Sequence, residues 1–138
     1  MLNEFFAYPA TFAGGVNVAA GDVNADSFPE IITGPGLGGG PLLRIWEGLV
    51  PHQLTQFNAF PPGKPGSPPP FQGDQLWASG LYVGVTDLDA DGDDDIIAGP
   101  AAGRVSTIRI FDGSTQALVQ EKTMFDPTFL GGVFVAGN

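Results

Sequence analysis

Residues 84–100 read GVTDLDADGDDDIIAGP, and residues 19–35 read AAGDVNADSFPEIITGP. Both stretches contain a cluster of acidic residues, followed by an Ile-Ile pair and then a Gly-Pro pair. Aligning Asp22 with Asp87 sets the two copies 65 residues apart. A repeated pattern of this kind indicates a structure built from copies of one unit, each burying its apolar faces on its neighbours.

The repeat extends beyond the acidic stretches. The sequence LRIWEG at 43–48 matches IRIFDG at 108–113, and FNAFP at 57–61 has its counterpart in KTMFDP at 122–127. The two ends also match, TFAGGVNVA at 11–19 with TFLGGVFVA at 128–136. The step from Gly80 to Gly132 is only 52 residues, so the first copy holds about 13 more residues than the second.

These extra residues predict an insertion between the copies. Residues 61–74 are rich in proline and read as an extended surface loop. The predicted organisation is a single repeat region over residues 1–138: a first repeat at about 12–60, the insertion at 61–74, a second repeat at about 77–127, and the start of a third at 128–138.

Each copy contains four candidate strands separated by Gly, Pro or acidic turns, and no stretch predicts a helix. The expected strands are 16–20, 31–33, 42–46 and 54–60 in the first copy, and 81–86, 95–98, 106–111 and 117–125 in the second. Four short strands in a repeat of about 50 residues are typical of a β-propeller blade. We therefore predict an all-β fold of about two four-stranded antiparallel blades. The alternative is a single sandwich of about eight to ten strands.

The charge of the chain is concentrated. Fifteen acids against five bases give a net charge of −10, which argues against nucleic acid or an anionic membrane as the main partner, because both require basic patches. Nine of the fifteen acids lie in the two acidic windows: Asp22, Asp26, Glu30, Asp87, Asp89, Asp91, Asp93, Asp94 and Asp95.

There is no cysteine, which excludes disulfides and thiolate chemistry. No apolar run approaches the length of a membrane span, and the first residues lack the pattern of a signal peptide, so we expect no membrane insertion and either a cytoplasmic protein or an export signal outside these residues.

The second acidic window predicts a calcium-binding loop. Its carboxylates stand at positions one, three, five and nine, as Asp87, Asp89, Asp91 and Asp95, with Gly92 after the third. A tight loop with this spacing directs alternate side chains inward, and calcium takes about six to eight oxygen ligands in a flexible shell. The carbonyl of Asp93 at position seven is expected to supply a further oxygen. Clustered carboxylates repel one another without a cation, so a hard divalent ion is the expected counter-charge.

The first window keeps the oxygen ligands with changes that predict weaker binding. Its expected ligands are Asp22, Asn24, Asp26, the carbonyl of Phe28, and Glu30, with Ser27 where the second copy has glycine. An EF-hand loop opens in the same way, but it requires a carboxylate at position twelve, where this chain has Thr33 and Ala98. The alternative to metal binding is a pair of solvated acidic turns.

On these motifs the chain resembles the FG-GAP (VCBS-type) repeats of integrin-α-like calcium-binding β-propellers, over nearly its whole length. The residues that carry the resemblance are GDVNAD followed by EIITGP, and DLDADGDDDIIAGP. The resemblance implies that each acidic loop joins the innermost strand of a blade to the second strand and holds calcium through the ligands named above. Propellers of that family have more blades than the two of this chain.

The expected function is that of a binding or structural module rather than an enzyme. A calcium-stabilised module for protein or carbohydrate contact, as in adhesion, is the first hypothesis, and the resemblance and the supply of calcium imply an exported or cell-surface protein. The alternatives are a purely architectural repeat and a fragment of a propeller-type polysaccharide lyase or hydrolase. His52 is the only histidine and has no nucleophile at motif spacing, so the sequence does not supply a recognisable catalytic set.

The strand count also predicts self-association. Two blades with spare strands at 3–8 and 132–136 leave unpaired edges at both ends, and such edges associate. Head-to-tail contacts between identical chains close into a ring when the rotation divides evenly, so we expect three or four copies in a closed ring. The alternative is that the chain is a piece of a longer propeller.

Overall fold

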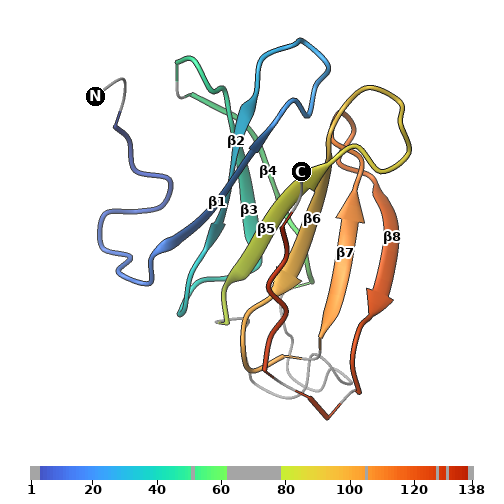
Figure 1. Ribbon diagram of the computed structural model, residues 1–138. Helices are drawn as coiled ribbons and strands as arrows, with labels where there is room; N and C mark the ends of the chain where they lie inside the picture. Colours follow the sequence, from blue (N-terminus) through green and yellow to red (C-terminus); the bar gives the residue numbers. More distant parts are fainter. Residues whose placement is uncertain are drawn as a thin grey trace.

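The computed structural model describes residues 4–50, 52–61, 79–104, 106–126, 128–129 and 131–136. In these residues the chain forms eight strands and no helix (Figure 1). The strands are β1 (Val16–Gly21), β2 (Glu30–Pro35), β3 (Leu42–Trp46), β4 (Gln53–Asn58), β5 (Leu81–Thr86), β6 (Asp95–Pro100), β7 (Thr107–Phe111) and β8 (Leu118–Thr123). The described residues form no helix long and apolar enough to cross a membrane.

The strands form two four-stranded antiparallel sheets, in the orders β1-β2-β3-β4 and β5-β6-β7-β8. The prediction of an all-β fold with four strands in each copy is confirmed. The two sheets also share their register: Asn17 pairs with Gly34 as Tyr82 pairs with Gly99. Each has an irregularity between its third and fourth strands, beside Trp46 in the first sheet and Phe111 in the second. The 65-residue repeat is therefore a repeat of backbone structure as well as of sequence.

Several predicted strand limits were wrong by a few residues. The second strand of each sheet continues to its Gly-Pro pair, because Pro35 still lies opposite Val16 and Pro100 opposite Leu81. The last strand of each sheet is shorter than predicted and ends at Asn58 or Thr123. Residues 62–78 lie outside the described residues. They include all but the first residue of the predicted proline-rich insertion, and the start of the second repeat.

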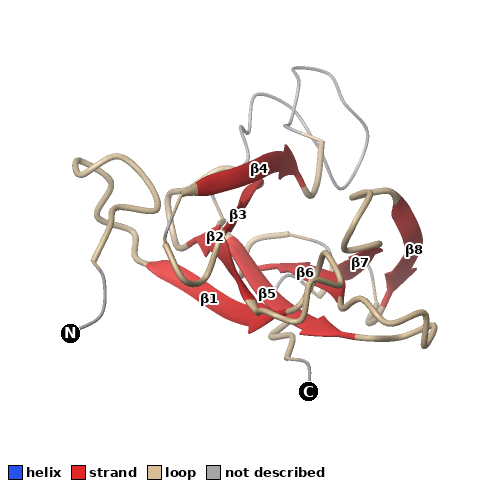
Figure 2. Cartoon of the chain, turned by 90° about the horizontal axis from the view of Figure 1, so that it is seen from above, coloured by secondary structure: helices blue, strands red, loops and turns tan. Residues whose placement is uncertain are grey.

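The core lies between the two sheets, and β5 packs against β1 and β2 (Figure 2). Ile32, Leu43 and Ile45 of the first sheet are at most 1% exposed, and Leu81 of β5 is fully buried. The rings of Phe57 and Phe111 meet edge to face with centroids 4.9 Å apart. We call the contact between the two sheets the internal interface. It stabilises the pair of sheets because burying a large aliphatic side chain contributes about 1.5–3 kcal/mol.

The strands predicted at 3–8 and 132–136 do not form. Residue 3 lies outside the described residues, and residues 4–8 and 132–136 have no strand pairing. The first segment is held by side-chain contacts: the Tyr8 hydroxyl lies 2.9 Å from the carbonyl oxygens of both Thr33 and Leu42, and the ring of Phe5 packs on Trp46. The second segment contacts Pro100 through the Val133 amide, which donates to the Pro100 carbonyl at 2.9 Å. Side-chain hydrogen bonds and aromatic packing, rather than a strand ladder, therefore anchor the first segment.

Candidate metal centre

The two acidic loops lie at the same end of the two sheets, each between the first and second strands of its sheet (Figure 1). Loop 1 comprises residues 22–29 between β1 and β2, and loop 2 comprises residues 87–94 between β5 and β6. The turns after β3 and β7 reach the same end, because strands alternate direction along each sheet. We call this end of the molecule the loop end.

Loop 2 gathers three exposed carboxylates. One oxygen from each of Asp87, Asp89 and Asp91 lies within 4.8 Å of the others, which is the only such acidic cluster in the described part of the chain. The loop is held by its own side chains: the Ala90 amide donates to Asp87 at 2.6 Å, and the Asp93 amide donates to Asp91 at 3.2 Å. Three anionic side chains are thereby directed toward one small volume, which suits a hard cation.

Two more carboxylates of the same loop region are buried. Asp93 is 7% exposed and Asp95 is 3% exposed. Asp95 accepts a hydrogen bond from the Leu88 amide at 3.1 Å, whereas the buried Oδ1 atom of Asp93 has no hydrogen-bond partner. Burial raises the pKa of both carboxyl groups, and the negative charge of Asp91 adds to the increase. A cation bound in loop 2 would favour the ionised form of these groups.

In loop 1 the predicted ligands accept backbone hydrogen bonds. Asp22 accepts from the amides of Asp26 and Ser27 at 3.1 and 2.8 Å, and Asn24 also accepts from Asp26 at 3.0 Å. Asp26 accepts from the Phe28 amide at 2.8 Å. These bonds stabilise a tight turn around the oxygens.

The last predicted ligand of loop 1 is buried. Glu30 is 1% exposed and accepts from the Val23 amide at 3.1 Å, as Asp95 accepts from Leu88 in loop 2. Burial raises the pKa of the Glu30 carboxyl, and the charges of Asp26 and Asp22 raise it further. Position nine therefore has the same structural role in both loops: a buried carboxylate that ties the start of the second strand to the loop.

Both loops need left-handed backbone at the same two positions. Ala25 and Ala90 have φ values of 59° and 62°, and Ser27 has a φ of 72° where Gly92 has 105°. A residue with a side chain is strained in this region, but glycine is not. The serine that stands in loop 1 where loop 2 has glycine is therefore a strained residue of its turn.

Exchanging these two residues is expected to change stability in opposite directions. Ser27→Gly removes left-handed strain and should raise the free energy of unfolding by about 1 kcal/mol, and Gly92→Ser should lower it by about the same amount. Urea denaturation of the two variants beside the unsubstituted chain measures both effects. Equal, small changes of the same sign would contradict this account.

The two loops are hydrogen-bonded to each other. The Asp22 amide donates to Asp94 Oδ2 at 3.0 Å, and the Asp94 amide donates to the Asp22 carbonyl at 2.7 Å. A Cβ atom at Gly21 would lie 2.4 Å from Asp94 Oδ2, so this glycine permits the close approach. Sequence reasoning counted Asp94 among the clustered acids but did not assign it this bridging position.

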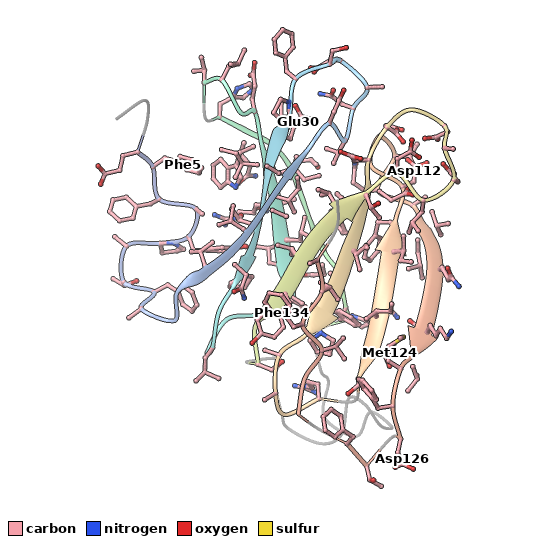
Figure 3. The ribbon with its side chains drawn as sticks, in the orientation of Figure 1. Phe5, Glu30, Asp112, Met124, Asp126 and Phe134 are labelled. Carbon is pink, nitrogen blue, oxygen red and sulfur yellow. The ribbon has the colours of Figure 1, made fainter. Side chains whose placement is uncertain are left out.

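A second feature that sequence reasoning missed is the turn after β7. Asp112 accepts from the amide and hydroxyl of Thr115 and from Ser114, and the Thr115 bonds lower the pKa of its carboxyl group. The following Gly113 lies against loop 2: a Cβ atom there would be 2.2 Å from the Asp94 carbonyl. Figure 3 shows Asp112 and Glu30 at the loop end. The Gly48 position repeats this contact against Pro29, so the recurrence of Glu-Gly and Asp-Gly at the same register was the available signal.

No protein-family model, curated protein sequence or solved structure matches this chain. The function therefore has to be inferred from its own residues. The relevant observations are the repeated sheets, the acidic cluster of loop 2, the buried carboxylates of both loops and the hydrogen bonds that join the loops.

Proposed function

We propose that this chain is a calcium-binding module of β-propeller type, in which calcium stabilises two blade-like repeats and the loop end contacts a protein or carbohydrate partner. The observation that carries the proposal is the pair of acidic loops at equivalent places, with a three-carboxylate cluster in one of them. A purely architectural repeat would bind the same ions. Contact with a partner is therefore the property that distinguishes a binding module from an architectural repeat.

Loop 2 is the stronger proposed site. Its ligands are Asp87, Asp89, Asp91, Asp95 and the Asp93 carbonyl. Support comes from the clustered exposed carboxylates of Asp87, Asp89 and Asp91. Calcium accepts this mixture of carboxylate and carbonyl oxygens in a flexible geometry, whereas magnesium demands a stricter octahedral shell.

Loop 1 is the weaker proposed site. Its ligands are Asp22, Asn24, Asp26, the Phe28 carbonyl and Glu30. The neutral Asn24 side chain reduces the negative charge, and several ligand oxygens already accept amide hydrogen bonds. Fewer charged ligands and a strained turn at Ser27 both favour a lower affinity.

Apolar side chains at the loop end favour a protein as the partner. Phe28 and Leu88 project from the two loops with exposed fractions of 54% and 53%, and Leu49 and Val50 in the turn after β3 are 63% and 67% exposed. Exposed apolar groups beside charged loops are typical of interaction surfaces. Contact with partners outside the cell, where calcium is plentiful, is consistent with this arrangement. Screening proteins and glycans in calcium and in chelator would separate binding from a purely architectural role.

Calorimetric titration tests the ranking of the two sites. We expect the unsubstituted chain to bind calcium in two events, and Asp89→Ala to remove the tighter one, since it deletes a charged ligand from the more acidic loop. Asn24→Ala should weaken only the second event. Each variant serves as the other's control, because both remove one exposed ligand side chain. Equal losses in the two variants would show that the ranking is wrong, and the absence of any calcium heat would overturn the proposed function.

A further inference from the structure

The outer face of the first sheet repeats a surface that is buried inside the molecule. At the internal interface, Leu81 and Val83 of β5 are 0% and 7% exposed. Their counterparts 65 residues earlier, Val16 and Val18 of β1, are 43% and 60% exposed. The positions that β5 buries at the internal interface are therefore only partly covered in β1, where Val16 and Val18 border a pocket with residues 5–10 and Phe12.

The arginine in the third strand of each sheet makes an equivalent contact on this face. Arg109 donates from Nη1 to the Ala59 carbonyl at 3.2 Å, and its guanidinium lies 5.1 Å from the centre of the Phe60 ring. Arg44 donates to the Ala7 carbonyl at 2.6 Å and lies over Tyr8, whereas Arg109 lies over Phe60. Residues 7–8 thus do for the first sheet what residues 59–60 do for the second. Phe5 also packs on Trp46 as Phe57 packs on Phe111, so residues 5–8 hold, on the outer face of the first sheet, the place that residues 57–60 hold at the internal interface. A second copy has to displace residues 5–8 to bring its own residues 122–125 to this place.

The outer face of the second sheet repeats the complementary surface. Leu43 and Ile45 are buried at the internal interface, and their counterparts Ile108 and Ile110 border a groove of about 230 Å³. Gln120, Lys122 and Met124 form the rest of its lining. Lys122 stands where the first sheet has Phe57, the partner of Phe111 in the internal aromatic pair. Trp46, the counterpart of Phe111, is 8% exposed and carries the ring of Phe5, so the Lys122 side chain of a second copy has to displace Phe5 to reach it. An ammonium group over an indole ring is then a favourable pair.

Residues 131–136 cover part of this receiving face. The ring of Phe134 packs on Tyr82 at 5.1 Å, and the segment borders a hollow with β1 and β5 (Figure 3). It occupies the place that an incoming β1 would take. This segment has no strand pairing and its Phe134 is 78% exposed, whereas all six residues of β1 pair with β2. In a competition for the same place, the C-terminal segment is therefore the one that moves aside.

We infer that the outer face of the second sheet binds the outer face of the first sheet of a second copy of this chain, in a head-to-tail contact that reproduces the internal interface. The contact depends on the repeated faces and not on calcium, so it goes beyond the proposed function. The contact is heterologous, since each copy uses a different face at its two ends. It is thus able to propagate and close into the ring of several copies predicted from the strand count.

Sedimentation velocity in calcium buffer, over a concentration series up to hundreds of micromolar, tests the contact. Val18→Glu places a charge on one face, and Ile108→Glu places a charge on the other. We expect the unsubstituted chain to show species of at least twice the monomer mass, and each variant alone to remain monomeric. An equimolar mixture of the variants should form a dimer that grows no further, because only one intact pair of faces remains. Phe134→Ala should loosen the competing segment and lower the concentration for half-assembly several-fold.

Thermal melting of each variant shows whether it is folded. If Ile108→Glu does not fold, Lys122→Glu replaces it, because Lys122 is exposed. A chain that stays monomeric at every concentration would overturn the inference. Failure of the mixture to form a dimer would overturn the head-to-tail geometry. Weaker assembly of Phe134→Ala would overturn the displacement of residues 131–136.

Discussion

Removal of calcium is expected to lower the melting temperature of this chain by about 10 °C or more. An ion that binds only the folded state stabilises it by about 2.7 kcal/mol at a free concentration of about 100 times its dissociation constant. The weaker site in loop 1 would add a smaller contribution, because its dissociation constant is higher. For a domain of this size, 1 kcal/mol corresponds to a shift of a few degrees. The buried carboxylates of Glu30, Asp93 and Asp95 add to the effect, because they lose their counter-charge in chelator.

Calorimetric melting in calcium and in excess chelator measures this difference, and re-addition of calcium should restore the original curve. The double variant Asn24→Ala with Asp89→Ala is the matched control, since it should melt at nearly the same temperature in both buffers. Superimposed curves for the unsubstituted chain would mean that the loops do not hold structural calcium. The acidic loops would then be solvated turns.

Gly113→Ala is expected to destabilise the chain by about 3 kcal/mol, at the upper end of the usual cost of overpacking. The added Cβ atom would lie 2.2 Å from the Asp94 carbonyl oxygen and 2.7 Å from that of Val23. Both neighbours are backbone atoms, so the clash is not relieved by a side-chain rotation. The turn after β7 has to move away from the two acidic loops, and the calcium-dependent part of the stability should fall with it.

Urea denaturation with and without calcium measures both effects. Ser114→Ala is the control in the same turn: its hydroxyl donates to Asp112 at 3.1 Å on an exposed surface, so its loss should cost less than 1 kcal/mol. Equal stabilities of the two variants would show that the turn adapts freely. The contact between Gly113 and the loops would then have no part in organising the loop end.

Much of the fold was predictable from short-range patterns. Strand positions followed from apolar runs bounded by Gly, Pro and acidic residues, and the 65-residue register predicted that both copies have the same pairing. The residues of each loop were also local, because a calcium loop places its ligands within nine consecutive positions. The limits of β2 and β4 were less predictable, since pairing across a sheet, and not residue preference, decides where a ladder ends.

The sequence by itself determined an all-β chain with four strands in each copy and two acidic loops at equivalent positions, because periodicity and turn residues act through near neighbours in the chain. Only the tertiary structure decided the bond between Asp22 and Asp94, the contact of Gly113 with loop 2, and the arginine contacts over Tyr8 and Phe60. Each of these joins residues that are more than 15 positions apart, so no local pattern specifies it. Such contacts form only when the tertiary fold brings segments that are distant in the sequence together.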